Sequence, residues 1–179
     1  MADALKGTVW GWRALFAAVV VGLIYLRLLP LGHQAGAWPA PDFVLCLTCA
    51  LVLRRPEFVP ALLIAAMVLI EDLLLMRPPG LWAALMLMGT EFLRRRAQFS
   101  REIAFVTEWI MVAVVMCAML LGYRLALALV MLPQVAFGHA LAQIAGSIAA
   151  YPLVVGVLRL GLGLRKPATG ELDAMGRRL

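Results

Sequence analysis

The sequence predicts an all-α membrane protein, folded as a single six-helix transmembrane bundle. Three observations predict this class. The 179 residues are 64% hydrophobic and 15% charged, with a mean hydropathy of +0.95, whereas a soluble domain carries about 45–50% apolar and about 25% charged residues. The apolar residues form continuous runs, unlike the alternating pattern of a β-barrel strand. Six runs occur, and the segments outside them are too short to fold as domains of their own.

Charged residues or turn-forming Pro and Gly separate the six runs. The second and fourth runs are shorter than the roughly 20 residues that cross a hydrocarbon core about 30 Å thick, so we expect other helices to shield them. The sequence leaves open whether residues 124–132 extend the fifth helix or form an interfacial turn. The spans are expected at residues 14–31, 43–53, 58–76, 81–93, 103–123 and 135–160.

The first run also has features of a secretory signal peptide, because the small residues Ala35, Gly36 and Ala37 follow it. However, the run is long for the apolar region of a signal peptide, and it contains Arg27. The sequence therefore favours a first span that is retained.

The distribution of cations predicts the orientation. If the N-terminus is cytoplasmic, 13 of the 16 Lys and Arg residues lie on the cytoplasmic side, and the exceptions are Arg27, Arg77 and Arg124. Cytoplasmic segments of membrane proteins carry such an excess of cations, so both termini are expected in the cytoplasm. The cluster at residues 94–96 is expected to contact anionic membrane lipid. It is too short, and too close to a span, to indicate nucleic-acid binding.

Carboxylates within apolar segments are costly and are therefore candidates for function. Glu71 and Asp72 are adjacent, so on a helix they point about 100° apart and cannot form a catalytic pair. We expect either a structural ion pair with Arg77 or Arg124, or a feature of the helix end, or a recognition role in which Asp72 binds a partner. Glu108 is expected near the inner interface, where it contacts either a buried partner or a lipid headgroup. The spacing of Glu91 to the cations that follow it predicts an ordinary intrahelical pair.

The sixth run carries two stripes with helical spacing. Small residues at every fourth position permit close helix approach, and they are Gly138, Ala142, Gly146 and Ala150. A second, polar stripe predicts either hydrogen bonds between helices or a ligand or proton pathway, and it contains His139, Gln143, Ser147 and Tyr151. The first run has a weaker small stripe that could seat a helix of this chain or of a partner, formed by Ala14, Ala18 and Gly22.

Enzymatic and metal-site signals are absent from the sequence. Cys46 and Cys49 form a C-x-x-C within an apolar run, but no second pair or His cluster completes a tetrahedral site, so all three cysteines are expected to pack as small hydrophobic residues. No nucleophile elbow, zinc-protease, P-loop or dinucleotide-binding motif occurs. The sequence predicts a protein that is not an enzyme and that uses no cofactor.

Two segments resemble the MreD family of bacterial rod shape-determining membrane proteins. The first is the second-span signature, Pro41-Asp42-Phe43-Val44-Leu45 followed by Leu53-Arg54-Arg55-Pro56-Glu57. The second is the junction between the third and fourth helices, Glu71-Asp72-Leu73-Leu74 followed by Pro79-Gly80-Leu81-Trp82-Ala83-Ala84-Leu85. Spans two to four carry the motifs, and the remaining spans match in layout.

The resemblance implies a non-enzymatic inner-membrane subunit of the cell-elongation complex, which regulates cell shape and peptidoglycan synthesis. It implies binding to the MreC scaffold and, through MreC, association with the MreB filament, the RodA glycan polymerase and a class B penicillin-binding transpeptidase. It also implies a fold similar to the S component of energy-coupling-factor transporters. The alternative is therefore a small-solute-binding subunit of such a transporter, with His139 and Gln143 lining a pocket. An intramembrane enzyme is disfavoured, because no convergent catalytic set is present.

Overall fold

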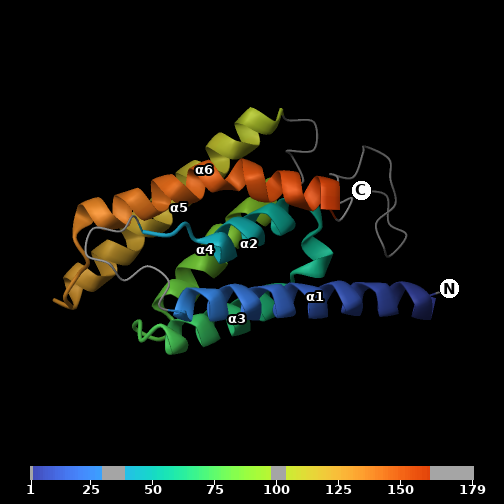
Figure 1. The fold of residues 1–179 in the computed structure, drawn as a ribbon, viewed down its shortest axis with the longest axis horizontal. Coiled ribbons are helices and arrows are strands. Elements are labelled where there is room, and N and C mark those ends of the chain that lie inside the picture. The colour runs from blue at the N-terminus through green and yellow to red at the C-terminus, as the bar shows by residue number, and fades with distance from the viewer. Residues whose placement is uncertain (1, 30–38, 98–103, 162–179) are drawn as a thin grey trace.

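The computed structural model describes residues 2–29, 39–97 and 104–161, and within these ranges it is helical, with no strand (Figure 1). In chain order, three shorter helices, α2 to α4, follow a long N-terminal helix and precede a pair of long C-terminal helices. The elements are α1 (Ala2–Leu28), α2 (Phe43–Arg54), the 3₁₀ helix η1 (Pro56–Phe58), α3 (Ala61–Leu74), α4 (Leu81–Ala97), α5 (Phe105–Leu129) and α6 (Phe137–Gly161).

Helix boundaries agree with the expected spans except where local chemistry overrides hydropathy. α1 begins at Ala2, because no proline interrupts the residues before the apolar run. α3 begins only at Ala61, because two prolines turn the chain through η1 first. α5 continues to Leu129, so residues 124–129 extend the fifth helix and the turn follows them. Met131, with φ 54°, lies in that turn.

Three helices are long and apolar enough to cross a membrane, over the segments Val9–Leu28, Phe105–Leu129 and Phe137–Leu160. By contrast, α2 has 12 residues, a length of about 18 Å at 1.5 Å per residue. It does not need to reach both membrane surfaces by itself, because every residue from Val44 to Arg54 is buried. α2 packs on α4 and α6 and lies between α1 and α6 in Figure 1. A fully buried helix can be apolar all round, as α2 is.

Contacts near the ends of the helices show that consecutive helices alternate in direction. At one end of the bundle, Arg13 of α1 donates to Glu57 O beyond α2 (3.3 Å), Arg94 of α4 donates to Val59 O before α3 (2.7 Å), and Arg54 of α2 contacts the start of α5. We name this the Arg54 end. At the other end, Arg27 at the end of α1 contacts the start of α2 and the end of α3. We name this the Arg27 end. This alternation is the one required by a bundle of antiparallel neighbours.

Candidate functional site

A buried polar cluster joins α2, α5 and α6 at the Arg54 end. Arg54 Nη1 lies 2.9 Å from Glu108 Oε1, and the Tyr151 hydroxyl donates to the same carboxylate oxygen at 2.7 Å. None of the three residues is more than 1% exposed. Arg54 also donates to Ala50 O, at 3.2 Å. Glu108 therefore has buried partners, which decides between the two alternatives that the sequence left open for it.

The geometry of this cluster suits it to hold α2, α5 and α6 together. Taking a charge out of water costs several kcal/mol, and an ion pair recovers this only with close contacts and additional hydrogen bonds. Here the carboxylate of Glu108 receives donors from two other helices. Within the described residues, Arg54 Nε and Nη2 have no hydrogen-bond partner, so the contact of Nη1 with Glu108 is the main compensation for the buried charge of Arg54.

A second charged cluster lies at the Arg27 end. Arg27 Nη1 is 2.7 Å from Glu71 Oε1 and 3.3 Å from Asp42 Oδ2, so one guanidinium links α1 to α3 and to the start of α2. The two carboxylates are 0% and 4% exposed and the Arg27 side chain 19%. Glu71 thus forms the structural ion pair, but its partner is Arg27 rather than the expected Arg77 or Arg124. The reason is that the last turn of α1 packs beside α3.

Asp42 also organises the start of α2. Its carboxylate accepts from Leu45 N at 3.1 Å, which is a helix N-cap. Its own backbone N–H donates to Ser147 Oγ at 2.8 Å, and that hydroxyl donates to Gln143 O. One turn further along α2, the Cys46 thiol donates to Ser147 O at 3.2 Å. These contacts fix the α2–α6 interface, and none of them exposes a reactive group.

Asp72 serves the first turn of α4. Its Oδ2 accepts hydrogen bonds from Gly80 N and Ala83 N, both at 3.2 Å, and the residue is 0% exposed. A helix N-terminus has unpaired backbone donors and a partial positive charge, so a carboxylate is stabilised there. Glu71 and Asp72 therefore face different elements, as their adjacency predicted. Asp72 contacts α4 inside this chain, and its proposed role in partner recognition stays a prediction.

The polar stripe of α6 is divided by burial. Ser147 and Tyr151 are buried and bond to α2 and α5, Gln143 is half-buried, and His139 is exposed. The buried half thus makes the expected hydrogen bonds between helices. The residue of α6 that contacts Asp42, at the start of α2, is Ser147. The part of α6 that precedes Ser147 therefore projects beyond the start of α2. This position leaves His139 outside the interface.

The small stripe of α6 is also used only in part. A Cβ on Gly146 would lie 3.5 Å from the Pro41 ring, an ordinary contact, whereas a Cβ on Gly138 would meet nothing within 4 Å. Ala142 and Ala150 are half-buried. Within the described residues, Gly138 thus has no close neighbour, because α6 has passed the start of α2 there, and close approach of a helix from another chain at Gly138 stays a prediction.

The small residues of α1 face away from the other described helices. Ala14, Ala18 and Gly22 are exposed, and a Cβ on Gly22 would meet nothing within 4 Å. No helix of this chain, among the residues that the structure describes, occupies the stripe. A seat for a partner helix stays a prediction.

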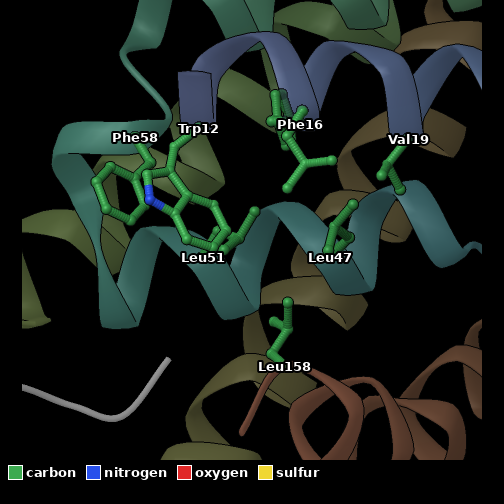
Figure 2. A pocket seen from close by; sticks show the side chains of 8 residues that line it. Trp12, Phe16, Val19, Leu47, Leu51, Phe58 and Leu158 are labelled. Atoms are coloured by element: carbon green, nitrogen blue, oxygen red, sulfur yellow. The ribbon is translucent and has the colours of Figure 1, made fainter. Parts of the chain in front are cut away.

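An apolar cavity of about 120 Å³ lies between α1, α2 and α6 (Figure 2). Hydrophobic and aromatic side chains form its whole lining, and neither His139 nor Gln143 contributes to it. One end is closed by Trp12 and Phe58, whose rings stack with centroids 5.2 Å apart. The solute pocket expected in the transporter alternative, lined by the polar stripe, is therefore not the cavity that the structure describes.

No metal or nucleophile site emerges among the described residues. They contain no group of three metal-ligating side chains. Cys46 and Cys49 are buried and unpaired on α2, while Cys117 is exposed on α5.

The Glu91–Arg94 pair forms as its spacing predicted, at 3.0 Å.

Sequence reasoning missed two centres of the charged clusters and one close helix contact. Apart from the resemblance, Arg54 enters the prediction only as one of the cytoplasmic cations, and Arg27 only as a feature that disfavours signal cleavage. Arg27 lies within an apolar run, which is itself a sign of a buried partner, whereas Arg54 directly follows its run. No other small residue stands three or four positions from Gly89, so the sequence carries no sign of a close helix contact there. A Cβ on Gly89 would lie 2.8 Å from Met119 Sδ and 3.1 Å from Val115 Cγ1, so α4 and α5 approach closely there.

Comparison with known proteins adds no relative. No protein-family model, curated protein or solved structure matches this chain significantly.

Proposed function

We propose that this chain is a non-enzymatic, multi-pass subunit of the bacterial cell-elongation complex in the inner membrane, and that it binds the MreC scaffold. The observation that carries the proposal is the position of the residues that resemble MreD. Asp42 caps α2, Arg54 pairs with Glu108, and Asp72 caps α4. The signature residues thus hold the bundle together, which is the role expected of residues that define a fold.

The proposed topology has six spans with both termini in the cytoplasm. The positive-inside rule supports it, because the cations of the described helices gather at the Arg54 end. Arg13, Arg54, Arg55 and Arg94 lie there, as does Arg159, whose guanidinium is 5.8 Å from the Phe105 ring centre. Arg27 and Arg77 lie at the opposite end. In this topology the Arg54 end faces the cytoplasm.

The interaction surface proposed for MreC is the exposed face of α1. The buried charges are occupied inside the bundle, by ion pairs or, for Asp72, by backbone N–H groups, while α1 presents Ala14, Ala18 and Gly22 outward. Small residues at four-residue spacing allow a second helix to pack closely in a bilayer, where van der Waals contact drives association. Through MreC the chain would associate with the MreB filament, the RodA polymerase and the class B transpeptidase.

The proposal is tested by co-purification of the full chain with MreC in mild detergent. We expect recovery with the unmodified chain and a loss of at least fivefold with Gly22→Leu, because the leucine would hold a partner helix away. Gly156→Leu on α6 is the matched control, since a Cβ is unobstructed there as well, and it should keep MreC. Equal recovery with both variants would reject α1 as the surface.

A second measurement separates the proposed function from the transporter alternative. The purified chain is screened for thermal stabilisation by vitamins, and no compound is expected to stabilise it. A strong shift with one vitamin, together with no recovery of MreC by the unmodified chain, would replace the proposed function by that of a solute-binding subunit.

A further inference from the structure

The cavity beside α2 has the form of a lateral groove. Its walls are α1, with Trp12 and Val19, and the end of α6, with Leu158; its floor is α2, with Leu47 and Leu51 (Figure 2). α1 packs mainly on α3 and η1, while α6 packs on α2 and α5. The two walls of the groove are therefore supported by different neighbouring elements. Leu15 and Val19 are each 41% exposed, which opens the groove to the surroundings of the bundle.

The groove accepts only an apolar and slender occupant. A cavity lined by hydrocarbon stays dry, and one of about 150 Å³ can hold a small apolar molecule. The volume of about 120 Å³ is of this order. A helix about 10 Å across is too wide, whereas a lipid acyl chain is a flexible string of methylenes. Because three helices are apolar enough to cross a membrane, acyl chains are the solvent that meets the open side.

Cations flank the groove where it approaches the Arg54 end. Arg13 follows Trp12 on one wall, and its guanidinium donates to Glu57 O beside the lining residue Phe58, whereas the Arg159 guanidinium lies over the Phe105 ring of α5. Arg55 belongs to the same group, since the Arg55–Glu57 ion pair measures 3.6 Å. The two cations Arg13 and Arg55 meet the single carboxylate of Glu57, so this group has a net positive charge. Trp12, stacked on Phe58, is of the residue type that is enriched at the membrane interface.

We propose that this groove binds an anionic phospholipid, with one acyl chain lying over Leu47 and Leu51 and the phosphate near Arg13 and Arg55. Clusters of Lys and Arg at the membrane surface attract anionic headgroups, and the dry channel orders the chain below them. The proposal requires that the bundle lie in a bilayer and does not depend on the elongation complex that it joins.

The buried position of α2 provides a sharp test. Leu47 and Leu51 are 9% and 6% exposed, so a lipid can reach them only through the groove. The full chain is reconstituted in vesicles containing phosphatidylglycerol with a photoreactive diazirine on one acyl chain, illuminated, and mapped by mass spectrometry. We expect adducts on Leu51 when the diazirine is near the glycerol and on Leu47 when it is further along. Leu62, 82% exposed on α3, reports general lipid contact.

Four variants and a lipid competition make the test specific. Val19→Trp at the mouth, or Leu158→Phe if the first does not insert, should reduce α2 adducts at least fivefold and leave those at Leu62. Unlabelled phosphatidylglycerol should compete at least fivefold better than phosphatidylcholine. The Arg13→Gln, Arg55→Gln double variant should abolish that preference, while the Arg95→Gln, Arg96→Gln control retains it. Absence of α2 adducts overturns the proposal, whether a second copy or a partner side chain fills the groove. Equal competition by the two lipids overturns the anionic headgroup.

Discussion

The guanidinium of Arg54 and the carboxylate of Glu108 meet at 2.9 Å across 54 residues of sequence, and both side chains are fully buried. This pair ties the end of α2 to the start of α5. An uncompensated buried charge is among the costliest defects in a folded protein. The pair is therefore the contact through which the stability of the bundle can be tested most directly.

Removal of one partner should be much worse than removal of both. We expect Glu108→Ala to destabilise the purified bundle by about 3–5 kcal/mol, because Arg54 would remain buried without its carboxylate. The Arg54→Met, Glu108→Met double variant should recover most of that loss. Unfolding in detergent, followed by circular dichroism, measures both. The control is Glu91→Gln, which breaks the half-exposed pair with Arg94 and should cost about 0.5 kcal/mol or less. A Glu108→Ala variant as stable as this control would contradict the fastening role.

Asp72 should respond to substitution as a helix cap. Asp72→Ala removes the acceptor of Gly80 N and Ala83 N, and loss of an N-cap costs about 1 kcal/mol, with more expected at a buried site. Asp72→Asn keeps a side-chain oxygen and should retain most of the stability. Thermal unfolding and the level of the protein in membranes measure the difference. If Asp72→Ala is as stable as the unmodified chain yet loses MreC, the residue contacts the partner instead.

Gly138 and Gly146 of α6 should differ in their tolerance of a large side chain. Gly146→Ala should be nearly silent, because its Cβ has 3.5 Å to Pro41, whereas Gly146→Leu should drive α6 away from the start of α2. Gly138→Leu places the same side chain in open space and is the matched control. Overpacking typically costs about 1–3 kcal/mol, so a clear drop in unfolding temperature is expected for Gly146→Leu alone. Equal stability of the two leucine variants would contradict the packing described for α6.

Much of the fold could be predicted from the sequence, because hydropathy and helix-breaking residues act locally. The six helices lie where the six apolar runs do, and the limits of α2 were expected within one residue. Proline and glycine placed the turns. The errors in the helix boundaries also have local causes: α1 begins before its apolar run, and α3 begins only after Pro60. Hydropathy alone reports neither cause.

The polar clusters could be predicted only in part, because a partner distant in sequence leaves no periodic trace. Glu108 and Ser147 were singled out as members of a polar network and are buried in polar contacts between helices, but nothing near Glu108 in the sequence indicates Arg54. Likewise, Arg27 lies 44 residues before Glu71, and only the packing of α1 on α3 brings them together. His139 had the right spacing and the wrong environment, since helix periodicity says which residues share a face and not where a neighbouring helix ends.

The last prediction is the orientation of the bundle. Fusions of a compartment reporter after Arg55, Arg96 and Arg178 should report the cytoplasm, and fusions after Trp38 and Pro79 the periplasm. The third outer junction belongs after Pro133, since α5 continues to Leu129 and a fusion at Arg124 would cut the helix. The reason is the gathering of cations at the Arg54 end, which the positive-inside rule assigns to the cytoplasm.

A periplasmic signal after Arg96 would contradict the six-span topology, because the last turn of α4 lies at the Arg54 end, where Arg94 donates to Pro56 O. The control is a pair of added charges: two lysines inserted after Pro79 should weaken the asymmetry and yield mixed signals at neighbouring junctions. An unchanged, uniform orientation in that variant would show that buried contacts such as Arg27–Glu71 and Arg54–Glu108, rather than loop charge, fix the direction of the short helices.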